Sequence, residues 1–202
     1  MSEMENVVVV RFEEPSKAYE ALSVLKQRHE DDTIELKAAA VVQRGADGVL
    51  NIVESADNVA LVGTASGSLI GMLIGVIGGP VGVLLGWAAG AGAGALYDID
   101  QAETSYKTLG VLASAIPFGS TAVVADVIET AVEVVDGEMA KLDGEVTRKP
   151  VSEVLDEIEL AEAAAEAAAA EARRVAREKR KSEVTADLEK RKLALKEKLH
   201  VS

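Results

Sequence analysis

The chain has 202 residues, a formal net charge of −13 and no cysteine. Its length suits one domain of ordinary size with appendages, and the absence of cysteine excludes disulfides, thiolate catalysis and cysteine-based metal sites. Residues 1–150 carry a net charge of −12 and residues 151–172 carry −7, whereas residues 173–202 carry +6. Because neutralising phosphates needs a broad basic face, this distribution argues against a nucleic-acid-binding protein.

The first 56 residues have the apolar patterns of three strands and one helix. Apolar side chains recur at helical spacing after Pro15, and Asp47-Gly48 is a turn signal between two strand-like runs. We expect a strand at residues 7–12 and a helix that begins at residue 15. A second strand at 33–44 and its hairpin partner at 49–53 follow. This segment is expected to form the first half of an α+β domain.

Glycine then recurs at every fourth position in two successive runs, one before and one after Pro80, in a stretch that has no charged residue between Asp57 and Asp98. The repeating residues are Gly63, Gly67, Gly71, Gly75, Gly79, Gly82, Gly86, Gly90 and Gly94. On a helix such residues form a stripe without side chains, which lets a second backbone approach closely. Each interior glycine costs about 1 kcal/mol relative to alanine, so packing must offset it. We expect a glycine-zipper helical hairpin over residues 57–98, packing within itself, between copies or both.

The turn of this hairpin is expected at Gly78, Gly79 and Pro80. Beyond the hairpin we expect a helix over residues 102–116 and a strand over 120–126. A second helix over 128–142 and an edge strand over 144–148 follow. Without the insert, the first six of the expected elements follow the order β-α-β-β-α-β, which is the split βαβ arrangement of a ferredoxin-like domain. This α+β domain would be discontinuous, formed by residues 1–56 and 99–150.

Residues 151–202 predict one long charged helix. No proline or glycine occurs between residues 151 and 199, and a helix of that length extends about 70 Å at 1.5 Å per residue. A sparse apolar seam runs along it through Val184, Leu188, Leu195 and Leu199. The helix could be solvated, act as a semi-rigid spacer or coiled-coil partner, or contact another protein or anionic lipid through residues 173–199.

The glycine repeat, followed by Ile116-Pro117-Phe118-Gly119-Ser120-Thr121-Ala122, resembles a family of bacterial and archaeal proteins. It is domain-of-unknown-function family 1269, whose members are described as membrane proteins. The resemblance covers roughly residues 5 to 150, and the charged tail looks like an addition to it. It implies membrane association and no established activity, so it identifies no catalytic residue.

Site chemistry is sparse in this sequence. The two histidines, His29 and His200, have no partner at ligand spacing, so we expect no metal site. Catalytic residues and cofactors are likewise not expected. Asp98 and Asp100 follow the glycine repeat and could bind a cation at a pore mouth, although such residues more commonly mark the end of a buried segment.

The expected function is therefore non-enzymatic self-assembly. Hairpin arms at residues 59–77 and 81–97 barely reach the length that crosses a bilayer. Every Lys and Arg lies outside them, so the domain and tail of an inserted hairpin would be cytoplasmic. The protein would then be an oligomeric scaffold at the cytoplasmic membrane. A soluble cytoplasmic shell or filament with buried hairpins, and a small cation channel, are the alternatives, while a solitary soluble monomer would leave the apolar stretch without shelter.

Overall fold

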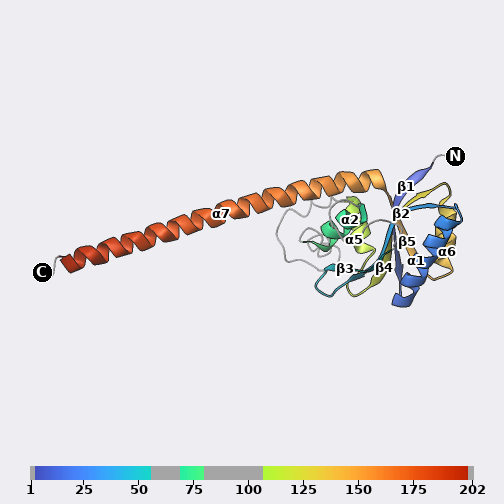
Figure 1. Ribbon diagram of the computed structural model, residues 1–202, viewed down its shortest axis with the longest axis horizontal. Coiled ribbons are helices and arrows are strands. Elements are labelled where there is room, and N and C mark those ends of the chain that lie inside the picture. The colour runs from blue at the N-terminus through green and yellow to red at the C-terminus, as the bar shows by residue number, and fades with distance from the viewer. Residues whose placement is uncertain (1–2, 56–68, 80–106, 200–202) are drawn as a thin grey trace. The chain divides into compact units, whose positions relative to one another are not determined.

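The computed structural model describes residues 3–55, 69–79 and 107–199 (Figure 1). The chain divides into two compact units, Met1–Ala161 and Glu162–Ser202. The first unit contains a five-stranded sheet and the helices that cover it. The second is the remainder of α7 (Val151–Leu199), a continuous helix of 49 residues. The first turns of α7, as far as Ala161, therefore belong to the unit that contains the sheet.

All the neighbouring strands of the sheet are antiparallel, in the order β3-β2-β4-β1-β5. The strands are β1 (Met4–Phe12), β2 (Glu35–Arg44), β3 (Leu50–Ser55), β4 (Thr121–Glu129) and β5 (Glu145–Pro150). Because β4 pairs with both β1 and β2, those two strands run in the same direction on either side of it. Helix α1 (Pro15–Glu30) connects β1 to β2, and α6 (Val132–Ala140) connects β4 to β5. Two β-α-β units are thus interleaved.

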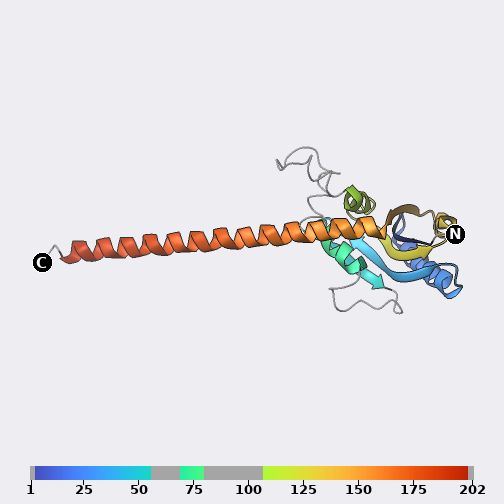
Figure 2. The same ribbon diagram turned by 90° about the horizontal axis from the view of Figure 1, so that it is seen from above.

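Helices cover both faces of this sheet (Figure 1). Successive valines of β1 point to opposite faces, so Val8 and Val10 pack with α1 and α6, while Val7 and Val9 belong to the other core. That other core includes α2 (Leu69–Gly78), α5 (Lys107–Ser114) and the first turns of α7. Figure 2 shows α2 and α5 on either side of α7 in this layer. The central strands are buried on both faces, which explains their continuous apolar runs.

The α+β class, the five strands and the long last helix are confirmed, but one helix boundary was wrong. We expected a helix from residue 128, whereas β4 continues to Glu129 and α6 begins at Val132. The strand is extended because Ile128 pairs with Glu5 on one side and Glu35 on the other. Of the first predicted hairpin arm the structure describes α2. The second arm and Pro80 lie outside the described residues.

Candidate functional site

Helix α2 lies on the sheet with its apolar side inward. Its buried side chains belong to the core that also contains strand residues and α5, and they are Ile70, Leu73, Ile74, Val76 and Ile77. Gly71 is half-buried and Gly75 is exposed. At 100° per residue both lie on the side of the helix away from those side chains. Gly75 therefore faces outward, with Gly71 one turn earlier on the same side of the helix.

The glycines of this segment have different surroundings. A Cβ placed on Gly75 would meet no atom of the described residues within 4 Å outside its own helix. A Cβ on Gly78 would lie 3.0 Å from the backbone nitrogen of Leu50 in β3, and one on Gly79 would lie 2.6 Å from the Gly75 carbonyl oxygen. Gly79 is thus required by a close contact within the chain and Gly78 is tightly packed on β3, whereas no described residue crowds Gly75. The other repeat glycines, Gly63, Gly67, Gly82, Gly86, Gly90 and Gly94, lie outside the described residues.

The helix that returns from the insert, α5, is held at its N-terminal end by the base of α7. The Glu157 carboxylate accepts hydrogen bonds from the backbone N–H groups of Thr108 and Leu109, at 2.8 and 2.7 Å. The Thr108 hydroxyl donates to Glu153, one turn earlier on α7, at 3.2 Å. A carboxylate at a helix N-terminus satisfies N–H groups that have no partner within the helix and complements the helix dipole.

At its C-terminal end α5 is held by Arg44, the last residue of β2. The guanidinium is buried and donates hydrogen bonds to the carbonyl oxygens of Ala113 and Ile116, at 2.8 and 3.0 Å. Its central carbon lies 4.6 Å from the ring centroid of Phe118. Burial lowers the pKa of Arg44, while the cation is placed where the helix dipole favours it.

Backbone hydrogen bonds join the same arginine to the loop that begins β4. The Arg44 N–H donates to the Ser120 carbonyl oxygen at 3.0 Å, and the Gly119 N–H donates to the Arg44 carbonyl oxygen at 2.8 Å. Gly119 has φ +77°, a left-handed conformation that favours glycine. Part of the Pro-Phe-Gly-Ser motif is therefore explained as a docking loop for Arg44. Neither Arg44 nor Glu157 was singled out from the sequence.

A buried carboxyl group lies in the middle of the sheet. Asp126 on β4 is 6% exposed, and its Oδ1 has no hydrogen-bond partner in the described structure. Burial, with Glu5 and Glu35 nearby, raises its pKa to about 6, against the opposing effect of Lys37. Lys37 is the extra residue at an irregularity of β2 and forms an ion pair with Glu5 at 2.7 Å. This group can exchange a proton near neutral pH.

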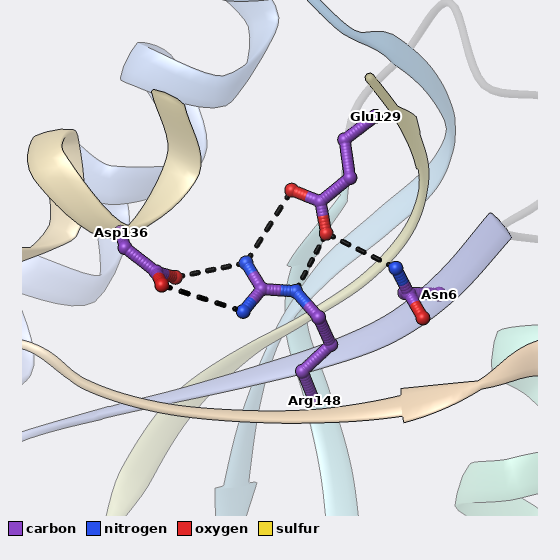
Figure 3. A network of polar contacts seen from close by, with 4 residues as sticks. All are labelled: Asn6, Glu129, Asp136 and Arg148. Carbon is purple, nitrogen blue, oxygen red and sulfur yellow. Dashed lines mark hydrogen bonds and ion pairs between the residues drawn. The ribbon is translucent and has the colours of Figure 1, made fainter. Parts of the chain in front are cut away.

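On the other face a partly buried ion-pair network joins three strands to α6 (Figure 3). The Arg148 guanidinium lies between Glu129, with Nε 2.5 Å from Oε1, and Asp136, with Nη2 2.8 Å from Oδ1. Asn6 donates to the same Glu129 oxygen at 3.2 Å. Burial acts to lower the pKa of Arg148, but the bonds to Asp136 and Glu129 outweigh it and raise the pKa. Because these charges are mutually satisfied, we assign the network a structural role.

Comparison with known protein families identifies where this chain belongs. The family described as "Protein of unknown function (DUF1269)" matches residues 64–165, just over half of the 202 residues. The chain belongs to the DUF1269 family. No curated protein and no solved structure matches the chain.

The DUF1269 match differs in extent from the resemblance drawn over residues 5 to 150. It begins within the glycine repeat and ends fifteen residues into α7. Glu153, Glu157 and the α5 residues that they contact all lie inside it. Arg44, which holds the other end of α5, precedes it. The C-terminal end of α5, inside the matched segment, is therefore held by a side chain from β2, which precedes that segment.

The remaining predicted features of this DUF1269 protein are placed only in part. His29 is exposed, and its Nδ1 accepts a hydrogen bond from the Leu36 N–H at 3.3 Å. Asp98 and Asp100 lie outside the described residues, as does His200. Among the residues that are described, no group of three or more side chains is arranged to hold a metal ion. Within the same residues, every helix is too short or too polar to cross a membrane.

Proposed function

We propose that this protein is a non-enzymatic, self-associating scaffold. In this proposal the exposed side of α2 around Gly75, called here the glycine face, packs against the glycine face of a second copy. The observation that carries the proposal is that a Cβ on the exposed Gly75 would meet no atom of the described residues within 4 Å. Glycine in a helix interior costs about 1 kcal/mol relative to alanine. No close contact among the described residues accounts for that cost, whereas close approach of a second helix would.

The opposite side of α2 supports the same proposal. Its five buried apolar side chains already pack on the sheet, so α2 is presented on a folded support with Gly75 outward. Gly137 on α6 also has room for a Cβ, but it does not belong to a four-residue repeat. It is therefore a suitable control for the effect of filling an open helical glycine.

We further infer that the domain is ferredoxin-like, formed by β1-α1-β2-β4-α6-β5. The order β2-β4-β1-β5, with each helix connecting strands that flank a third, supports this topology. Strand β3 and the segment with the glycine repeat are then an insertion between β2 and β4. The glycine-zipper hairpin over residues 57–98 remains part of the proposal.

Attachment to the cytoplasmic membrane through residues 57–98, with the domain and tail in the cytoplasm, is a second proposal. It is supported by the uncharged stretch between Asp57 and Asp98. The packing of α2 favours assembly of folded domains over a two-arm bilayer span, because the apolar side chains that lipid would contact are buried in the domain. A soluble shell or filament is the form of assembly that this packing suits best.

Light scattering after size exclusion tests the proposal with two matched variants. Wild-type protein is expected to elute as an oligomer of its 21.1 kDa chain. Gly75→Leu should reduce the mass toward that of a monomer, since the side chain projects into the space that a second copy would fill. Gly137→Leu should keep the wild-type mass. Unchanged circular dichroism in both variants would show that the domain is folded, and a Gly75→Leu variant with wild-type mass would disprove the packing role.

A further inference from the structure

The second unit of the chain carries a concentrated positive charge on one side of α7. Residues 173–181 contain six basic residues and one acid, and every one of them is exposed. At 3.6 residues per turn, five of the six bases lie within an arc of about 120°. We call this surface the basic face; it is formed by Arg173, Arg174, Arg177, Arg180 and Lys181.

Most of the charge on the basic face is available to a partner. Within the part of the chain that the structure describes, Arg173, Arg177 and Arg180 form no ion pair. Arg174 is paired along the helix with Glu171 at 2.7 Å and Glu178 at 3.4 Å.

Exposed apolar side chains continue the same face toward the C-terminus. Val184 and Leu188 are 59% and 52% exposed. They follow Arg173 by 11 and 15 residues, close to three and four whole turns, so they align with the basic face. Membrane binding of a surface helix strengthens with buried apolar area and with electrostatic attraction to anionic lipids, and this side of α7 offers both. A nucleic-acid backbone would use the charges but not the two apolar side chains.

The main competitor is a second copy of the same helix. Glu162 and Glu166 lie on the same side of α7, so an antiparallel copy could pair them with Lys181 and Arg177. Exposed pairs of this kind strengthen association only about twofold each. Each Lys or Arg near an anionic bilayer strengthens binding about fivefold. Five bases acting together therefore favour the bilayer by a wide margin.

We propose that the basic face of α7 binds the surface of a lipid bilayer that carries anionic headgroups, with Val184 and Leu188 entering the interface. This contact is independent of the glycine face. It provides attachment from the tail, whether or not copies assemble through α2. A Gly75→Leu variant should accordingly bind anionic vesicles as the wild type does.

Co-sedimentation of the full-length protein with vesicles at low salt tests this proposal. One vesicle type is pure phosphatidylcholine, and the other contains one third phosphatidylglycerol. The triple variant Arg173→Gln, Arg177→Gln, Arg180→Gln should partition about 100-fold more weakly onto the anionic vesicles, since three factors of about five are lost. Gln is a good helix former, so circular dichroism should show α7 unchanged.

A charge-neutral swap is the matched control for net charge. Arg177→Glu combined with Glu178→Arg keeps the composition but moves one base off the basic face, and it should weaken anionic binding at least fivefold. Equal anionic binding by wild-type protein and the triple variant would overturn the proposal, as would wild-type binding by the swap. Loss of oligomer mass in the triple variant without loss of vesicle affinity would show that the face pairs copies, and would also overturn it.

Discussion

The Glu157 carboxylate on α7 accepts a hydrogen bond from the backbone N–H of Thr108, at 2.8 Å, at the start of α5. Helix α5 has only eight residues, and isolated helices that short are unstable. It is therefore stabilised by side chains from outside, with Glu157 at one end and Arg44 at the other. The base of the tail and the end of β2 together fix the segment that returns from the insert to β4.

Removing the N-terminal cap should loosen α5. We expect Glu157→Ala to cost about 2 kcal/mol in free energy of unfolding, because two backbone N–H groups lose a charged acceptor. Hydrogen exchange at Thr108 and Leu109 should accelerate, and Glu157→Gln should have a smaller effect because it keeps an acceptor oxygen. The exposed neighbour Glu159 is the control, and its change to Ala should cost less than about 0.5 kcal/mol. Equal losses in both alanine variants would contradict a capping role.

Arg44 should contribute more to the free energy of unfolding than an exposed arginine of the same sheet. We expect Arg44→Met to cost about 3 kcal/mol in urea unfolding, since the Ile116 carbonyl oxygen would lose the Arg44 donor and the Ala113 carbonyl oxygen would be left with the bond from the Ile116 N–H, at 3.2 Å. Arg11 forms an ion pair with Glu145 and is largely exposed, so Arg11→Met should cost less than about 1 kcal/mol. A cost for Arg44→Met as small as that of Arg11→Met would refute its role at the α5 terminus.

The network around Arg148 predicts a strong coupling between two residues. Arg148→Met leaves the Glu129 carboxylate, which is 1% exposed, without a counter-charge, and should cost about 3–5 kcal/mol. Adding Glu129→Gln should recover part of that loss, because the uncompensated charge is then removed. A double-mutant cycle by urea unfolding measures the recovery. Strictly additive losses would mean that the two side chains do not act as a pair.

Asp126 predicts a pH dependence with a definite sign. Its pKa is raised to about 6 in the folded protein, against about 4 in an unfolded chain. The folded state therefore binds more protons between these values, and the contribution of Asp126 to stability falls as pH rises from about 4 to above 6. Over this pH range the contribution of Asp126 to the free energy of unfolding falls by roughly 3 kcal/mol.

The variant Asp126→Asn isolates this effect from the other titrating groups. It should be more stable than wild type at pH 7 and should lose that advantage near pH 4, as measured by urea unfolding at a series of pH values. A difference between the two proteins that stays constant over this range would show that Asp126 does not titrate as expected.

Local patterns in the sequence predicted most of the secondary structure. The Asp47-Gly48 turn is found with Gly48 at φ +86°, and the absence of proline and glycine after Val151 predicted the 49-residue helix α7. Both features depend on neighbouring residues alone. The predicted helix began too early, at residue 128, because local sequence does not show long-range pairing. In the structure Ile128 pairs with Glu5 and Glu35, which keeps it in a strand.

The contacts that fix the insert could not be found in this way. Arg44 and Ile116 are 72 residues apart, and Glu157 and Thr108 are 49 apart, so no local spacing reveals either pair. The two sides of α2 could not be told apart either, because the segment is apolar or glycine throughout and has no polar side. Only the packing on the sheet distinguishes the glycine face from the buried one.

A single engineered cysteine tests the glycine-face contact most directly, because the chain has no cysteine of its own. Packing of α2 on α2 of a second copy brings Gly75 close to its counterpart, within the 4.4–6.8 Å that a disulfide needs between Cα atoms. Under mild oxidation, Gly75→Cys should form a covalent dimer at dilutions where Gly137→Cys stays monomeric. Monomeric Gly75→Cys under conditions where the wild type is oligomeric would contradict packing of glycine face on glycine face.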